Sequence, residues 1–256
     1  MSHSSEPDVA GVAPHPHLEK YYGGESHRRH FVADIFDQTA RHYDRIDRVM
    51  SFGTGARYRR DALVRAGLTP GNRVLDVAIG TGLVARAAME ILGNDGEITG
   101  IDLSMGMLAE ARKALPIGLV QGLAEGLPFA DNSVDFVTMG YALRHVADLE
   151  TTFGEYRRVL KPGGTLLILE LSRPAGNTTV YRMTRFYMQR VVPLIARLGP
   201  GGRDSKKLME YFWDTIDQCV PPATILQALD SSGFVSSRRD VLHQVFSEYV
   251  ASKGND

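Results

Sequence analysis

The sequence predicts an α/β fold built on a doubly wound parallel sheet. From residue 73 onward, short strand-like segments alternate with segments of helical period, which is typical of a sheet that helices cover on both faces. The segment Thr165–Leu171 (TLLILEL) is apolar without alternation, as expected for a strand buried on both faces. The 256 residues include 43% hydrophobic and 23% charged side chains, so the chain can form a full core.

The N-terminal part of the chain is expected to form a disordered tail and then a helical cap. Residues 1–25 contain Ser, Pro, Gly and His without a sustained apolar period, and such a segment cannot offset the entropy cost of ordering. Six of the eight histidines lie in the first 42 residues, but no cysteine or regularly spaced carboxylates accompany them, so we expect no metal site. Residues 26–68 repeat apolar side chains at helical spacing, interrupted at Gly53 and Gly55.

Residues 26–256 are expected to form one domain. The predicted strands after the cap are Arg73–Ala78, Glu97–Asp102, Leu119–Gln121, Val134–Tyr141, Thr165–Leu171, Ser236–Asp240 and Gln244–Ala251. The predicted helices are Gly82–Leu92, Ser104–Ala114, Leu149–Leu160, Asp204–Ile216 and Pro222–Ser232. Ser104 is the expected N-cap of its helix, because its hydroxyl can accept a hydrogen bond from the first turn.

Residues 175–220 interrupt the alternation, and we expect them to form a lid. Within them, Tyr181–Leu198 interleaves aromatic and aliphatic side chains with four arginines. A lid over an apolar acceptor is favoured over contact with a lipid surface, and an ordinary covering helix with snorkelling arginines stays open.

Charge and cysteine content exclude several classes of protein. With 29 basic and 30 acidic residues, the net charge is −1, which excludes a broad basic face for nucleic acid. The single cysteine, Cys219, excludes an internal disulfide framework and a multi-cysteine zinc site. No run of 18 apolar residues could span a membrane. The first residues also lack the apolar segment of a secretory signal, so we expect a cytoplasmic protein.

A glycine loop and an acidic residue provide the first chemical signal. The segment Asp76–Gly82 (DVAIGTG) joins a predicted strand to a predicted helix. Gly80 and Gly82 would let the backbone approach a ligand and present N–H groups at the helix N-terminus. Asp102 ends the next strand, 20 residues after Gly82, where a carboxylate can accept both hydroxyls of a ribose. Together they predict a nucleoside-containing cofactor.

Two cofactors fit this loop. Gly80, Gly82 and Ala85 match the dinucleotide pattern G-x-G-x-x-G/A, which would make the protein an NAD-dependent oxidoreductase. Asp76 favours the other reading, since a carboxylate suits a sulfonium with an ammonium group better than it suits a pyrophosphate. Titration with each cofactor would separate the two.

Three further segments carry a family resemblance. They are Tyr43–Gly53 (YDRIDRVMSFG), Tyr141–Val146 (YALRHV) and Arg158–Ser172 (RVLKPGGTLLILELS). With Glu125–Phe129 (EGLPF), they resemble the class I S-adenosylmethionine methyltransferases, and among these the UbiE-type family, which methylates a ring carbon of ubiquinone and menaquinone precursors. The resemblance implies a Rossmann-like sheet of seven strands with an antiparallel last strand. It also implies S-adenosylmethionine as cofactor and a small aromatic or quinone-like acceptor methylated at carbon.

The resemblance also implies individual contacts. The resemblance implies Thr81 at the amino-acid end of the cofactor, Asp102 at the ribose, Leu103, Met107 and the Ala124 N–H at the adenine, and Gly140 near the methyl group. Asp76, Gly80 and Gly82 are cofactor residues expected from the loop itself, and Leu123 is expected beside the adenine without a side-chain hydrogen bond. Arg144 would stabilise a phenolate, and His145 could take the proton. Tyr43 would close over the cofactor.

Some positions depart from the family pattern. Leu123 stands where a polar residue usually meets the adenine, and Gly140 replaces a hydroxyl residue. Gly55 and Tyr58 replace His and Trp, and Asp217 replaces an arginine. These departures leave open an O- or N-methyltransferase of specialised metabolism and a catalytically silent cofactor-binding protein. A homodimer and peripheral contact with a membrane are further expectations.

Overall fold

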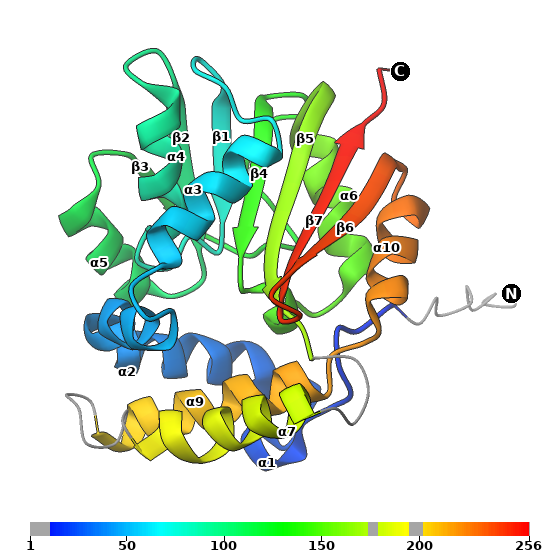
Figure 1. The fold of residues 1–256 in the computed structure, drawn as a ribbon. Helices are drawn as coiled ribbons and strands as arrows, with labels where there is room; N and C mark the ends of the chain where they lie inside the picture. The colour runs from blue at the N-terminus through cyan, green and yellow to red at the C-terminus, as the bar shows by residue number, and fades with distance from the viewer. Residues whose placement is uncertain (1–10, 174–178, 195–201, 256) are drawn as a thin grey trace, which may run out of the picture.

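The computed structural model describes residues 11–173, 179–194 and 202–255, which form a seven-stranded sheet and a layer of helices at one edge of it (Figure 1). The strands are β1 (Arg73–Val77), β2 (Glu97–Asp102), β3 (Gly118–Gln121), β4 (Val134–Gly140), β5 (Leu160–Leu171), β6 (Phe234–Leu242) and β7 (Phe246–Lys253). Their order is β3-β2-β1-β4-β5-β7-β6, and β7 is antiparallel to both of its neighbours. The predicted doubly wound fold with an antiparallel last strand is confirmed.

Helices cover both faces of the sheet. One face carries α3 (Gly55–Arg65), α4 (Leu83–Leu92) and α5 (Met105–Ala114), and the other carries α6 (Leu149–Val159) and α10 (Pro222–Ser231). In β5, Leu167 and Leu169 pack with the α3 and α4 side, whereas Leu166 and Ile168 pack with the α6 and α10 side. This division explains the apolar run without alternation in β5.

Residues 160–164 lie inside β5, although the sequence predicts that the strand begins at residue 165. Val134 pairs with Leu160 and Phe136 already pairs with Thr165, so the extra residues form a bulge that holds Gly163 at φ +75°. Ser104 caps α5 as predicted, because its hydroxyl accepts a hydrogen bond from the Met107 N–H.

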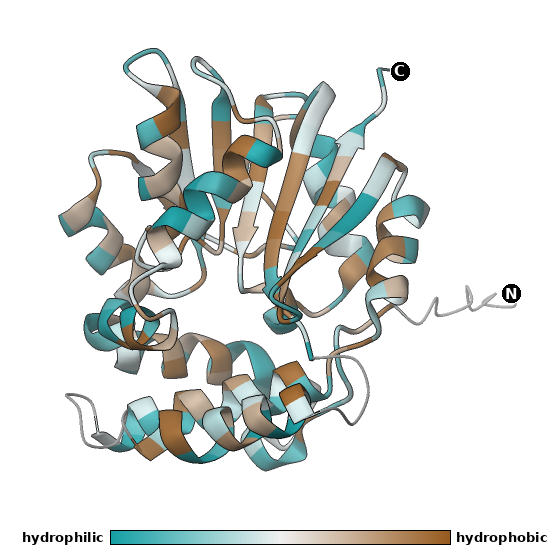
Figure 2. Cartoon of the chain, viewed as in Figure 1, coloured by the Kyte–Doolittle hydropathy of each residue, from teal (hydrophilic) through white to brown (hydrophobic). Residues whose placement is uncertain are grey.

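A third layer lies across the carboxyl ends of the parallel strands. It consists of α1 (Glu19–Tyr22), α2 (Glu25–Met50), α7 (Thr179–Phe186), the π-helical turn η2 (Tyr187–Val191) and α9 (Gly202–Asp217). These helices alternate hydrophilic and hydrophobic residues (Figure 2), and their buried side chains form a separate core around Tyr211 and Trp213. Among the described helices, none is both long and apolar enough to cross a membrane.

The structure differs from the expected tail of residues 1–25. Leu18 and Tyr22 are buried in the core of the helical layer, and His15 is buried as well. The Pro14 carbonyl accepts a hydrogen bond of 2.8 Å from the Val220 N–H, so residues 11–24 bind the end of α9. A few apolar side chains that fill a groove between distant elements leave no periodic signal in the sequence. Residues 1–10 of the expected tail, and 175–178 and 195–201 of the expected lid, lie outside the described residues.

Candidate functional site

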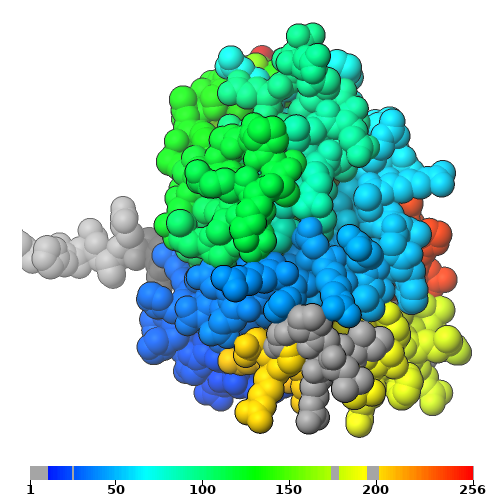
Figure 3. Space-filling view, turned by 90° about the vertical axis from the view of Figure 1, so that its left-hand side faces the viewer, coloured from blue at the N-terminus to red at the C-terminus, as the bar shows by residue number. Residues whose placement is uncertain are grey.

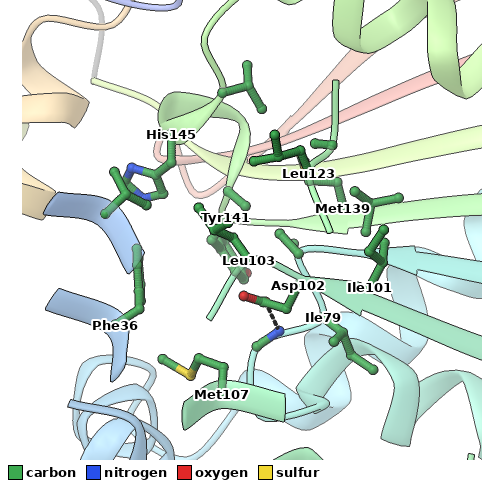
Figure 4. Close-up of a pocket in the computed structure, with 18 of the residues that line it drawn as sticks. Phe36, Ile79, Ile101, Asp102, Leu103, Met107, Leu123, Met139, Tyr141 and His145 are labelled. Carbon is green, nitrogen blue, oxygen red and sulfur yellow. Dashed lines mark hydrogen bonds between the residues drawn. The ribbon is translucent and has the colours of Figure 1, made fainter. Parts of the chain in front are cut away.

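A first cavity lies where the carboxyl ends of β1, β2 and β4 face helix α2 (Figure 4). Of the residues that the sequence singles out for cofactor binding, Gly80, Thr81, Asp102, Leu103, Met107, Leu123, Ala124 and Gly140 line it. Tyr43 and His145 also contribute to its wall. The strands end at this edge of the sheet, which is where ligands bind in open α/β folds.

The glycine loop makes a tight turn from β1 into α4. Gly80 and Gly82 both have positive φ values, +58° and +86°, and the Gly82 N–H donates to the Ile79 carbonyl. A Cβ atom on Gly82 would overlap Leu115, whereas nothing lies within 4 Å of the position of a Cβ atom on Gly80. Gly82 therefore serves the turn and its packing, and it is not part of the cavity wall.

Asp102 ties the loops after β1 and β2 together. Its carboxylate accepts hydrogen bonds from the Gly80 N–H at 2.7 Å (dashed in Figure 4) and from the Ser104 N–H at 2.8 Å. Burial raises the pKa of Asp102 to about 6, so its carboxylate is ionised at neutral pH. Each oxygen retains a lone pair for a further donor, as a ribose hydroxyl would be.

Asp76 does not line the first cavity, although it is expected at the amino-acid end of a cofactor. Asp76 and Thr138 are register partners on β1 and β4, and the Thr138 hydroxyl donates to Asp76 at 2.7 Å. The other carboxylate oxygen has no hydrogen-bond partner among the described residues, and burial raises the pKa of Asp76 to about 7.

The residues Arg144 and His145 occupy a short 3₁₀ turn, η1 (Leu143–His145), just after β4, and they point in different directions. His145 lines the first cavity, where its Nδ1 atom lies 3.1 Å from the Tyr211 hydroxyl and its ring stacks on Phe212. Burial lowers the pKa of His145 well below its usual range, so the ring is neutral. Its Nε2 atom has no hydrogen-bond partner in the part of the chain that the structure describes.

Arg144 lies in the wall of a second cavity and not of the first. Its guanidinium is fully buried, forms an ion pair with Glu170 and donates to the Thr215 hydroxyl at 3.2 Å. Burial lowers the pKa of Arg144. Within the described ranges, its Nη2 atom has no hydrogen-bond partner.

The second cavity has a volume of about 730 Å³. Its apolar wall comes mainly from Ile46, Met50, Tyr58, Leu171, Met183, Tyr187, Met188, Phe212, Trp213, Ile216, Val245 and Phe246. It shares Tyr43, Arg59 and Tyr141 with the first cavity, so these three side chains lie where the cavities adjoin. Such a mostly apolar space with a few polar groups is typical of a site for an organic molecule.

Helix α2 closes one side of the first cavity. Asp37 accepts hydrogen bonds from the Ser104 hydroxyl and from the Gly106 N–H, the latter at 2.7 Å. Asp44 accepts from the Thr81 hydroxyl and from Arg86. In Figure 3 the blue band of α2 runs between the sheet domain and the yellow helices below it. The two carboxylates are seven residues apart, or two helical turns, so they bind the loops after β1 and β2 from one face of α2.

Some residues of the cavities have no individual signal in the sequence. Arg59 and Tyr141 belong to this group, as do Arg28 and Phe36 of α2. Arg59 follows the Tyr43–Gly53 segment, but nothing distinguishes it from its exposed neighbour Arg60. The positive φ of Tyr141, +61°, turns the chain directly after β4 and is equally hidden in the sequence.

Comparison with known proteins gives one family. The ubiE/COQ5 methyltransferase family matches residues 24–246. A demethylmenaquinone methyltransferase of Symbiobacterium thermophilum is 34% identical over 84% of this chain and 89% of its own length. A ubiquinone/menaquinone biosynthesis C-methyltransferase UbiE of Shewanella halifaxensis is 35% identical over 79% of this chain and 82% of its own length.

Solved structures agree on the fold. A SAM-dependent methyltransferase from Aquifex aeolicus covers 76% of this chain and 88% of its own, with a TM-score of 0.56 and 18% identity. A possible histamine N-methyltransferase from Thermotoga maritima covers 86% of this chain and 99% of its own, with a TM-score of 0.60 and 19% identity. At these identities the likeness shows the fold alone.

Proposed function

The chain belongs to the ubiE/COQ5 methyltransferase family, and from this premise we propose that it transfers a methyl group from S-adenosylmethionine to a ring carbon of an apolar, quinone-like acceptor. The observation that carries the proposal is the junction of the two cavities. One cavity has the acidic and backbone groups that a nucleoside cofactor needs, and the adjoining one is large and apolar. Family membership also decides in favour of the sulfonium cofactor over the dinucleotide.

The residues of the first cavity fit S-adenosylmethionine. We assign Asp102 to the ribose hydroxyls, Leu103 and Met107 to the adenine face, and the Ala124 N–H to the adenine edge. Leu123 has no polar atom in its side chain, so the backbone must make the hydrogen bonds there. When bound, the cofactor supplies a methyl group on a positively charged sulfur, which is an excellent leaving group.

The second cavity fits the acceptor. Its 730 Å³ exceed what a single aromatic ring fills, so an apolar tail attached to the ring can be buried in it as well. Tyr43 lies at the junction and would help to exclude water while the acceptor carbon is held against the methyl group.

Two residues after β4 are placed to act on the acceptor's proton and on the negative charge of its deprotonated hydroxyl. A ring carbon becomes nucleophilic when the neighbouring hydroxyl loses its proton, and a ring proton must leave after the transfer. His145 is neutral and its Nε2 atom is unpartnered within the described residues. It lines the first cavity, so it can accept a proton from an acceptor ring held at the junction, as a weak base because burial lowers its pKa. Arg144 lines the acceptor cavity, and although Glu170 balances its charge, its Nη2 group has no acceptor within the described residues and can donate a hydrogen bond to the oxyanion.

Asp217, where the family carries an arginine, is compatible with this proposal. Its carboxylate accepts a hydrogen bond of 3.0 Å from the Tyr181 hydroxyl and lies 3.6 Å from the Arg173 guanidinium. Asp217 thus joins α9 to α7, and it is not part of the second cavity's wall. The substitution therefore alters how the lid is held and does not remove a group from the acceptor space.

The proposal includes contact between the lid and a membrane surface. Phe52 and Met183, which line the second cavity, are 79% and 68% exposed, and Phe186 is exposed beside them on α7. The described stretch 179–194 contains three exposed arginines and no acidic residue, which suits anionic headgroups. The lid boundaries, residence in the cytoplasm and a homodimer stay predictions.

The test is an acceptor panel. Purified protein and S-adenosylmethionine are incubated with chemically reduced demethylated naphthoquinones and benzoquinones that carry short prenyl tails, and S-adenosylhomocysteine is measured. We expect its formation with at least one quinol and none without acceptor, with Asp102→Asn as the impaired control. If catechols or amines are methylated while every quinol is inert, the protein is an O- or N-methyltransferase and the proposal is wrong. If no acceptor is methylated, the hypothesis of a catalytically silent cofactor-binding protein replaces the proposal.

A further inference from the structure

One buried cation at the junction of the cavities is not used by the mechanism above. Arg59, on α3, is only 3% exposed and lines both cavities. Its two terminal nitrogens bind the carboxylate of Asp47, one of them at 3.3 Å. Its guanidinium also lies 5.4 Å from the centre of the Tyr141 ring.

The pairing of Arg59 is incomplete. Its Nε–H is buried and has no hydrogen-bond acceptor in the described parts of the chain. Burying a cation is costly unless it is paired, and a buried donor without an acceptor adds to that cost. Asp47 balances the charge, but it leaves a fixed donor that an anionic ligand could use.

The position of Arg59 identifies the end of the cofactor that it can reach. In the assigned placement the adenine lies beside the chain after β2 and β3, and the ribose lies at Asp102. Because the strand order is β3-β2-β1-β4, the amino-acid end extends toward β1 and β4. Arg59 lies against Tyr141, directly after β4.

A second buried arginine in the wall of the first cavity, Arg28, lies away from Arg59. Arg28 donates to the carbonyl of Val146, and the next N–H, that of Ala147, donates to Glu125. Glu125 follows Ala124, which is assigned to the adenine edge. Arg28 therefore belongs to the adenine side of the cavity and not to the amino-acid side.

We propose that Arg59 binds the α-carboxylate of S-adenosylmethionine through its Nε–H, and that Asp47 and Tyr141 hold its guanidinium in place. The inference rests on the cofactor placement proposed above. A carboxylate is ionised at neutral pH, whereas the hydroxyl of an acceptor is neutral until it loses its proton. A permanently charged ligand group is thus the better match for Arg59, which lines the cofactor cavity, whereas Arg144 lines only the second cavity and faces the acceptor.

The absence of a side chain at Gly55 supports the role proposed for Arg59. A Cβ atom on Gly55 would lie 2.6 Å from Nη1 of Arg59, so the glycine leaves room for the guanidinium. Any side chain at this position would force the Arg59 head group to move. In this chain Gly55 is therefore a positioning residue for Arg59.

Isothermal titration with S-adenosylmethionine and with decarboxylated S-adenosylmethionine tests the proposal. Arg59→Met should weaken binding of the intact cofactor ~10-fold to ~150-fold, the range for a lost charge-assisted hydrogen bond. It should change binding of the decarboxylated cofactor less than ~3-fold. Gly55→Ala should produce the same selective loss to a smaller degree. Arg60→Met, next to it on α3 and half exposed, should bind both ligands like the wild type.

The controls separate the possible failures. Arg59→Met leaves Asp47 unpaired, so thermal unfolding is measured in parallel and Asp47→Asn/Arg59→Met, which removes both charges, is titrated as well. Equal losses for the two ligands, or no loss for either, would refute the proposal. A wild-type protein that binds neither ligand would instead refute the cofactor placement itself.

Discussion

Replacing Asp102 by Asn is the most informative single change at the first cavity. The carboxylate accepts two backbone hydrogen bonds, at 2.7 and 2.8 Å, and lines the cavity. An amide has only one carbonyl oxygen, so its NH₂ group must face either a backbone N–H or the ribose hydroxyls. Losing a hydrogen bond to a charged acceptor costs about 1.5–3 kcal/mol, which corresponds to roughly 10-fold to 150-fold in Kd.

The assay for Asp102→Asn is isothermal titration with S-adenosylmethionine at neutral pH. Asp95→Asn, in the exposed turn before β2, is the matched control and should bind like the wild type. An Asp102→Asn protein that folds with the wild-type thermal stability and keeps its affinity within about twofold would show that Asp102 does not hold the ribose.

The pH dependence provides a second readout for Asp102. Its pKa is raised to about 6, so the free protein is increasingly protonated at this site as the pH falls through that value. If the ionised form binds ribose, the affinity of the wild type should decline below about pH 6, by up to tenfold per pH unit, and the affinity of Asp102→Asn should not. A flat wild-type profile would contradict the role of the carboxylate.

Three further predictions concern stability. Gly82→Ala should lower the free energy of unfolding by about 3 kcal/mol, because the left-handed backbone costs about 1 kcal/mol and overpacking against Leu115 about 2 kcal/mol. Gly80→Ala, where the added Cβ atom meets open space, should lower it by only about 1 kcal/mol. Both values are measured by denaturant titration, and equal losses would contradict the packing role of Gly82. Arg144→Met should lower the free energy of unfolding by about 3–5 kcal/mol, because it leaves Glu170 buried and unpaired. The double variant Arg144→Met/Glu170→Met should recover most of this loss. A double variant as unstable as Arg144→Met would refute the explanation. His145 is neutral in the folded state, so the unfolded state binds more protons below about pH 6.5. The free energy of unfolding should therefore fall below that pH by up to about 1.4 kcal/mol per pH unit. His145→Gln should reduce this slope, and an unchanged slope would contradict the lowered pKa of His145.

The sheet and the glycine loop could be predicted from the sequence because both depend on local signals. Apolar period distinguishes strands from helices, and the spacing from Gly82 to Asp102 reflects one β–α–β unit. The direction in which individual side chains point was harder to predict. Asp76 lies one residue inside the strand, so the pleat turns it toward Thr138 and away from the cavity.

The contacts between distant segments were the least predictable part. Arg144 and His145 are neighbours in the sequence, but the 3₁₀ turn sends one to Glu170 and the other to the first cavity. Arg59 becomes distinctive only because α3 places it beside Tyr141, a residue far away in the chain. Such pairings depend on how helices dock on the sheet, and a single sequence does not encode them as a pattern.

The most direct test of the central claim is the position of the transferred methyl group. The protein is incubated with methyl-deuterated S-adenosylmethionine and a reduced, prenylated demethylquinone, and the product is analysed by mass spectrometry and NMR. We predict one deuterated methyl group, attached to a ring carbon next to a hydroxyl-bearing carbon. A label on oxygen, or recovery of unlabelled quinone with the cofactor intact, would contradict the proposed function.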